Sequence, residues 1–340
     1  MGRIIRIAQR YRVEVVIALA LIVLELGLGM FVPNALTVGN VTNILQTAAP
    51  LIILAFGELL VIITGGIDLS VGSIFSLSGI VSAAILVKFG VVDGIVIGLL
   101  TGVVFGVING LLVAVFGLAP FIVTLITYSV AGSLAFVATN GNSIAINSIG
   151  FGRVDTGNFL GIPNYDLNVL ILVIVLQFFL TRIVFGRWIY FVGSNERAAH
   201  LIGVPTRWVK IFVYGMSGLL AAVAGILSVA YLMNAESTAG AGLELQAIAA
   251  VVIGGASLFG GVGSAVGAAL GALLVVVIQN GIDLLGVNSF WQGTITGIVI
   301  LAAVFVERAT RNGTGGRQFN LKIFRIRNVD QADTPLSKVD

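Results

Sequence analysis

Residues 48–87 read AAPLIILAFGELLVIITGGIDLSVGSIFSLSGIVSAAILV and contain two charged residues, Glu58 and Asp68. The stretch holds two apolar runs, 48–64 and 70–87, and the pair Gly65-Gly66 begins the break between them. An α-helix rises about 1.5 Å per residue, so about 20 apolar residues cross the hydrocarbon core of a bilayer. Runs of this length and composition predict membrane-spanning helices.

The composition of the whole chain points the same way. Of its 340 residues, 58% are hydrophobic and 10% charged, and the mean hydropathy is +1.10; a soluble domain carries about 25% charged residues. A water-soluble globule is therefore excluded. Cysteine is absent, which removes disulfides and thiolate sites, and His200 is the single histidine. We therefore expect neither a metal site nor a catalytic site on this chain.

Ten apolar runs are candidate spans. They cover residues 15–33, 48–64, 70–87, 94–117, 119–138, 168–184, 211–233, 246–259, 264–285 and 291–306. The two short runs, 48–64 and 246–259, lead into Gly-rich stretches that allow a broken helix or a re-entrant turn. The first run is too long for a signal peptide and lacks a small-residue cleavage site, so we expect it to be retained. The sequence predicts an all-α polytopic membrane protein with about ten transmembrane helices, some of them interrupted at Gly-rich motifs.

The basic residues set the expected orientation. Sixteen of the 18 lysines and arginines lie in residues 3–12, 182–210 and 308–338, and basic clusters near span ends stay in the cytoplasm. Their clustering in two tails and one loop is typical of a membrane protein and does not indicate a nucleic-acid-binding face. Ten crossings place both termini inside. The expected segments are a cytoplasmic tail 1–12, a transmembrane domain 13–307 with an external loop 139–167 and a cytoplasmic loop 182–210, and a cytoplasmic tail 308–340.

Glycine recurs every four residues in two of the runs, and the two series are Gly102, Gly106, Gly110 and Gly263, Gly267, Gly271. Small residues on one helix face allow neighbouring backbones to approach closely, so we expect two packing seams. Residues 61–73 and 251–264 also echo one another if one residue is inserted. Such an echo is explained either by two related halves around a pathway or by a chance match between Gly-rich segments.

Three acids lie within apolar runs: Glu25, Glu58 and Asp68. A charge at membrane depth costs at least about 2.5–3.5 kcal/mol, so each acid should face a cavity, pair with a partner or be protonated. Asp68 or Ser70 can act as the N-cap of the next helix. A role in a polar pathway is the alternative, and the residues alone leave both open.

The loop 182–210 contains a predicted short helix. Asn195 or Ser194 can cap it, Glu196 suits its positive end, and Gly203 and Pro205 end it. Such a helix either lies among lipid headgroups or docks a cytoplasmic partner. Its hydropathy does not choose between these roles.

The segment 260–264, Gly-Gly-Val-Gly-Ser, superficially suggests a phosphate loop. The lysine that a nucleotide-binding loop requires is missing, and no hydrophilic domain surrounds the segment. A tight turn between two spans explains it better. We therefore expect this chain to hydrolyse no ATP by itself.

Four motifs, in order, resemble those of the ribose-type sugar permeases of ATP-binding-cassette (ABC) importers, inner-membrane components of binding-protein-dependent systems in the branched-chain amino acid/sugar permease superfamily. The motifs are Gly65-Gly-Ile-Asp-Leu-Ser-Val-Gly-Ser73, Gly193-x-Asn-x-x-Ala-Ala199, Leu201-Ile-Gly-Val204, and Glu244-x-x-Ala-Ile-Ala-Ala-Val-Val-Ile-Gly-Gly-Ala-Ser-Leu-x-Gly-Gly-Val-Gly-Ser264. The resemblance runs from about residue 43 to 306.

This resemblance implies the transmembrane subunit of a sugar importer in the bacterial inner membrane. It implies three partners: a cytoplasmic ATPase that holds the ATP and magnesium, an extracytoplasmic sugar-binding protein, and a second permease subunit, identical or homologous. No cofactor is expected on this chain. The ATPase-coupling residues it implies are Gly193, Asn195, Glu196, Ala198, Ala199 and Gly203. The residues expected along the substrate pathway are Asp68, Ser70, Thr124, Asn109 and Glu58.

The alternatives are a permease for nucleosides or branched-chain amino acids, and an ATP-independent carrier or channel. One departure from the family pattern concerns the fifth run. Many members carry an Arg-Gly pair there, whereas this chain has Ala131-Gly132. The local geometry, and with it the sugar, can therefore differ from those of ribose permeases.

Overall fold

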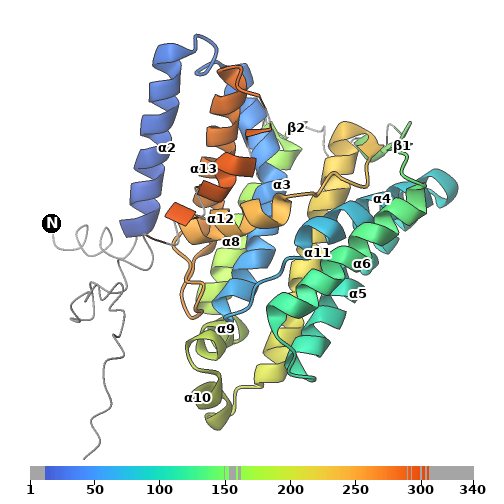
Figure 1. Ribbon diagram of the computed structural model, residues 1–340, viewed down its shortest axis with the longest axis vertical. Helices are drawn as coiled ribbons and strands as arrows, with labels where there is room; N and C mark the ends of the chain where they lie inside the picture. The colour runs from blue at the N-terminus through green and yellow to red at the C-terminus, as the bar shows by residue number, and fades with distance from the viewer. Residues whose placement is uncertain are drawn as a thin grey trace, which may run out of the picture.

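The computed structural model describes residues 12–148, 150–152, 158–159, 162–288, 290–291, 293–298, 301–302 and 305 (Figure 1). Both predicted tails, apart from Arg12, lie outside the described residues. The same is true of six residues of the predicted last span, 291–306, and of part of the loop 139–167.

Seven of the described helices are long and apolar enough to cross a membrane. They are α2 (Arg12–Phe31), α3 (Val38–Ile63), α4 (Val71–Phe89), α5 (Val91–Ala114), α6 (Pro120–Thr139), α11 (Thr206–Leu232) and α13 (Ala265–Leu284). An eighth span is possible if α8 (Asn164–Arg182) and α9 (Val184–Ser194), which meet at a 71° bend, form one crossing. The chain is therefore an all-α multi-pass membrane protein, as predicted.

The run 246–259 does not form a continuous spanning helix, and its helix is interrupted where the sequence allowed a break. Helix α12 (Leu243–Ile253) has 11 residues, about 16 Å of length, and gives way to turns that contain Gly255, Gly260 and Gly261 at positive φ. The other short run, 48–64, forms a continuous helix. It belongs to the 26-residue helix α3, whose central residues are buried.

Two short strand pairs lie at one end of the molecule, opposite α10 (Glu196–Leu201) (Figure 1). β1 (Ile144–Ala145) pairs antiparallel with β4 (Asn234–Ala235), and β2 (Asn158–Phe159) pairs with β3 (Ile162–Pro163). The β1–β4 pair ties the segment after α6 to the segment after α11. It therefore fixes the end of the bundle away from α10.

The core forms around α3 and α11, which pack against each other. Helix α11 also packs closely along α5. Gly102 and Gly106 of α5 face backbone carbonyls of α11. A β-carbon added at either glycine would overlap the carbonyl oxygen of Gly218 or Tyr214, respectively. The absence of side chains lets the two helices approach at backbone distance. The predicted seam on α5 is confirmed.

The second glycine seam is on α13. β-Carbons at Gly267 and Gly271 would overlap the carbonyl oxygens of Gly254 and Ala250, respectively. The short helix α12 therefore lies flat against the beginning of α13. This close approach holds α12 in place even though it is too short to cross the bilayer.

Candidate functional site

The break between α3 and α4 carries a buried polar network centred on Asp68. Its carboxylate Oδ1 accepts hydrogen bonds from the backbone N–H of Ser70 at 3.0 Å and from the Ser70 hydroxyl at 2.5 Å. Its second oxygen, Oδ2, accepts from the Ser217 hydroxyl of α11 at 2.9 Å. The backbone N–H of Asp68 donates to Glu58 Oε1 of α3 at 3.2 Å. Asp68 thus joins the break to α11 through its carboxylate and to α3 through its backbone N–H.

The network continues from Ser70 into α5 and α6. The Asn109 side-chain amide donates to Ser70 Oγ at 2.9 Å, and the Thr127 hydroxyl donates to Asn109 Oδ1 at 2.5 Å. Thr124, one turn earlier on α6, donates to the carbonyl of Ile67 at 3.2 Å and to that of Pro120 at 3.0 Å. The break is consequently bonded to α3, α5, α6 and α11.

All five residues expected along the pathway meet in this network. Glu58, Asp68, Ser70, Asn109 and Thr124 have no exposed surface, and each takes part in the hydrogen bonds above. Buried polar groups are favourable when they are hydrogen-bonded and costly when they are not. Their role in transport stays a prediction, and in the conformation described they hold four helices around the break.

Neither Asp68 nor Ser70 caps α4 with its side chain, so the expected capping hydrogen bond is wrong. Ser70 occupies the N-cap position, but its side chain accepts no hydrogen bond from the first turn. Instead its hydroxyl donates to Asp68, and Asp68 accepts from the Ser70 backbone. The pair therefore shapes the turn before α4 and leaves the first turn of that helix uncapped by side chains.

Sequence reasoning missed three residues of the site: Thr127, Ser217 and Tyr214. Tyr214 and Glu244 each keep one buried oxygen without a hydrogen-bond partner among the described residues. A β-carbon at Gly66 would lie 2.5 Å from the Tyr214 hydroxyl, and one at Gly72 would overlap Glu244 Oε2. Ordinary serines, threonines and tyrosines on apolar helices give no local signal of this kind, because only the fold brings them beside Asp68.

The predicted short helix in the loop 182–210 is confirmed as α10. Asn195 is its N-cap and accepts from the Ala198 backbone N–H at 3.0 Å, Glu196 begins its first turn, and Gly203 follows it at a φ of +87°. Ala199 is buried, whereas Leu201 and Ile202 are 85% and 71% exposed. The helix therefore presents an apolar tip at the end opposite the β1–β4 pair.

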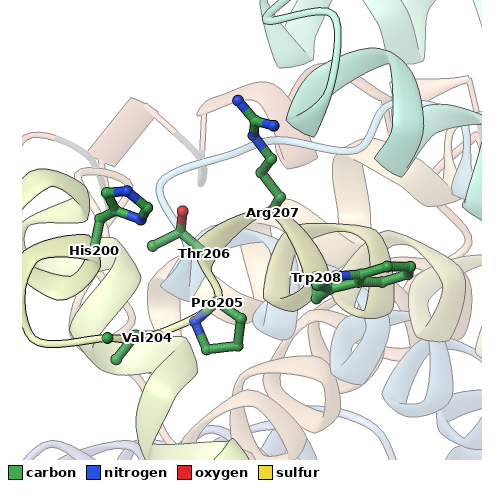
Figure 2. Close-up of a pocket in the computed structure, with 7 residues that line it drawn as sticks. His200, Val204, Pro205, Thr206, Arg207 and Trp208 are labelled. Carbon is green, nitrogen blue, oxygen red and sulfur yellow. The ribbon is translucent and has the colours of Figure 1, made fainter.

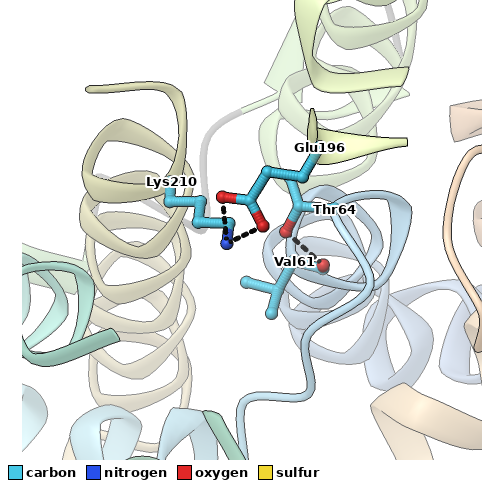
Figure 3. A network of polar contacts seen from close by, with 4 residues as sticks. All are labelled: Val61, Thr64, Glu196 and Lys210. Atoms are coloured by element: carbon cyan, nitrogen blue, oxygen red, sulfur yellow. Dashed lines mark hydrogen bonds and ion pairs between the residues drawn. The ribbon is translucent and has the colours of Figure 1, made fainter. Parts of the chain in front are cut away.

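Two further features surround α10. Lys210 of α11 forms an ion pair with Glu196 at 2.7 Å, and Figure 3 shows this contact in the same view as Val61 and Thr64 at the end of α3. A cavity of about 410 Å³ is lined by His200 and residues 203–208 (Figure 2). The turn from α10 into α11 therefore has an ion pair across it and a cavity beside it.

The predicted coupling residue Gly193 lies at a meeting point of three glycine motifs. Gly261 donates its backbone N–H to the carbonyl of Ile63 at 2.8 Å. A β-carbon at Gly193 would overlap that carbonyl oxygen and lie 2.7 Å from the nitrogen of Gly261, and one at Gly260 would lie 3.1 Å from the nitrogen of Gly65. We call this contact of residues 63–65, 193 and 260–261 the glycine junction. It joins α9, next to α10, to the break that carries Asp68.

Comparison with known proteins identifies the family. Residues 40–304 match the family model described as the permease component of branched-chain amino acid transport systems. The chain belongs to this family of membrane permeases.

Three curated relatives cover most of their own length and of this chain. It is 54% identical to a probable ABC transporter permease of Sinorhizobium fredii, over 91% of this chain and 93% of the relative. It is 44% identical to a ribose import permease of Bacillus subtilis, over 85% and 91%, and 36% identical to a D-allose transport system permease of Escherichia coli, over 80% and 84%. No solved structure matches the chain.

Proposed function

We propose that this chain is the membrane subunit of a bacterial ABC importer that brings a monosaccharide into the cytoplasm. The observation that carries the proposal is the 44% identity to a ribose import permease over 85% of the chain. The allose permease supports the substrate class, because it shares 36% identity over a similar length. The chain itself supplies no ATPase chemistry and depends on a separate subunit for energy.

We further propose ten crossings in the inner membrane with both termini in the cytoplasm. The eighth crossing is a broken segment, residues 236–264, in place of a continuous helix. Two contacts support it: the segment follows β4, which pairs with β1 at one end, and its Gly261 donates to Ile63 beside α9 toward the other end. The tenth crossing falls on 291–306, six residues of which are outside the described part of the chain.

We assign the proposed partners to the two ends of the molecule. The ATPase, with its ATP and magnesium, docks at α10, where the apolar tip and the ion pair lie. The sugar-binding protein docks at the β1–β4 end, and a second permease subunit, a copy or a homologue, completes the pathway. A movement of α10 is transmitted to the break between α3 and α4 through the glycine junction. The Asp68 network then transmits the movement to α5, α6 and α11, which move as rigid helices.

A permease for branched-chain amino acids is the second candidate, favoured by the description of the family whose model matches the chain. Deleting the gene in its host separates the candidates. We expect uptake of one labelled sugar in a panel of pentoses and hexoses to be lost while uptake of leucine and of uridine is unchanged. Loss of leucine uptake with every sugar unaffected would overturn the sugar proposal.

Reversing the charge at Glu196 should separate docking from folding. We expect Glu196→Lys to abolish uptake, because it places two cations together at 2.7 Å where an ion pair now stands, and to leave the membrane level of the protein unchanged, because exposed pairs contribute at most about 1 kcal/mol. The double variant Glu196→Lys/Lys210→Glu restores the ion pair with its polarity reversed. If the ATPase recognises the carboxylate at position 196, the double variant stays inactive and loses co-purifying ATPase; recovery of wild-type uptake would contradict the docking role.

A further inference from the structure

A second polar feature, separate from the Asp68 network, is an open pocket between α4, α6 and the segment that follows β4. Its volume is about 240 Å³, which suits a ligand smaller than the drug-sized molecules that occupy pockets of about 300–1,000 Å³. Seven of its eleven lining residues carry a hydroxyl group, and none of the eleven carries a charge. We call it the hydroxyl pocket.

Some of these hydroxyls are already occupied by protein partners. Ser76 accepts from the Gly240 backbone N–H at 2.8 Å, Ser237 shares a hydrogen bond with Thr139 at 3.0 Å, and Ser129 donates back to the Leu125 carbonyl at 3.2 Å. These bonds fix the walls of the pocket. They leave little capacity for a ligand at those three positions.

Four other hydroxyls have no hydrogen-bond partner within the described part of the chain. They belong to Ser73, Tyr128, Ser133 and Thr238. Ser73 is 7% exposed and lies at the floor, where a β-carbon on Gly132 would be 3.5 Å from its oxygen. Tyr128 is half-buried, and Ser133 lies exposed on the same helix. The pocket thus offers free groups that can both donate and accept.

This chemistry fits a neutral polyol. Each sugar hydroxyl both donates and accepts, so it pairs with serine, threonine and tyrosine hydroxyls without a charged partner. The rings of Tyr128 and Phe136 add apolar surface for the carbon skeleton. A free amino acid would bring a carboxylate and an ammonium group, and burying either without a charged or strongly polar partner is costly. The acid Glu244 lies against Gly72 and does not itself line the pocket.

The pocket is also positioned by the network described above. Ser73 stands three residues after Ser70, which Asp68 and Asn109 hold, and Tyr128 follows Thr127, which also bonds Asn109. The third wall follows β4, which pairs with β1 at the end of the bundle opposite α10 (Figure 1). With α10 in the cytoplasm, the pocket lies toward the outer face. A change at the Asp68 network would therefore move two walls of the pocket.

We propose that the hydroxyl pocket is where this chain contacts the transported monosaccharide, and that Ser73, Tyr128 and Ser133 determine which sugar passes. The proposal rests on the proposed function, since it names the substrate contacts of the same importer. It assigns the sugar to free hydroxyls and assigns the buried Asp68 network to positioning them.

The test removes hydroxyls without changing the shape of the pocket. Tyr128→Phe and Ser133→Ala are combined, and Thr101→Ala on α5 is the control, because the Thr101 hydroxyl bonds the Ile97 carbonyl of its own helix and does not line the pocket. Uptake is measured in the deletion host with the labelled monosaccharide that the wild-type chain takes up best, D-ribose being tried first. Two lost hydrogen bonds of about 0.5–1.5 kcal/mol each should raise KM about five- to 160-fold, while the control and the ATPase activity of the complex stay at wild-type values.

A blocking variant keeps the proposal falsifiable if hydroxyl loss also affects folding. Ser133→Trp adds a large ring at an exposed position, so it should fold, retain bound ATPase and stop uptake. Wild-type KM in the Tyr128→Phe/Ser133→Ala variant together with normal uptake by Ser133→Trp would overturn the pocket assignment. If the wild-type chain takes up no monosaccharide, the proposed function fails; if it does and the variants behave as wild type, only the pocket fails.

Discussion

Replacing Gly193 by alanine is expected to destabilise the folded protein by at least about 3 kcal/mol, the upper part of the range for overpacking a close contact. The added carbon would overlap the Ile63 carbonyl oxygen and lie 2.7 Å from the Gly261 nitrogen. Both are backbone atoms that hydrogen-bond to each other, so neither can rotate away as a side chain could. The measurement is chemical unfolding of the purified protein in detergent, together with its level in the membrane.

The matched control is Gly27→Ala in α2. Gly27 is also helical, but a β-carbon there meets nothing within 4 Å, so stability should change by less than about 1 kcal/mol. A Gly193→Ala protein as stable as this control, with normal uptake, would contradict the glycine junction. Wild-type stability with lost uptake would instead place the role of Gly193 in the binding of the ATPase.

Replacing Asp68 by alanine should cost at least about 3 kcal/mol and abolish uptake. The change leaves the Ser70 N–H, the Ser70 hydroxyl and the Ser217 hydroxyl without their common acceptor, and each buried donor left unpaired costs about 1–3 kcal/mol. Ser78→Ala is the control, because the Ser78 hydroxyl on α4 is buried without a partner in the described structure. That variant should be neutral or slightly more stable.

The Asp68→Asn variant separates folding from transport. An asparagine oxygen can still accept from Ser70, but its NH₂ group cannot accept from Ser217, so the bond to α11 must reverse or break. We expect a folded protein whose uptake is at least about tenfold lower or no longer coupled to ATP hydrolysis. Unchanged uptake kinetics would reduce Asp68 to a local turn-forming residue.

Much of the fold was predictable because span length and glycine spacing are local properties. The runs that begin at residues 94 and 264 formed helices with the expected seams, and Asn195 capped α10 as its position before Glu196 indicated. The run 246–259 has the hydropathy of a span, and its Gly-rich end was the signal that allowed a broken helix there. The glycines at 254 and 255 end the helix, and Gly254 packs directly on Gly267.

The site was predictable only in part, for a physical reason. Asp68 stood out because an acid in an apolar run requires an explanation, and Ser70 lay beside it in the sequence. Ser217 is separated from Asp68 by 149 positions, and a serine on an apolar helix is ordinary. Similarly, Tyr128 and Ser133 gained meaning only when the fold placed α6 beside α4 and the segment after β4.

The most direct test of the central claim, that this chain carries a sugar under the control of a separate ATPase, is uptake by proteoliposomes. The chain is purified with its ATPase and second permease subunit, reconstituted, and supplied with the binding protein and labelled D-ribose or the best sugar of the host panel. We predict that the sugar accumulates in the vesicles only when ATP is supplied on the side of the membrane that carries the ATPase, and that accumulation disappears with a non-hydrolysable analogue. Equal sugar entry without ATP, or ATP-driven accumulation of leucine and of no sugar, would contradict it.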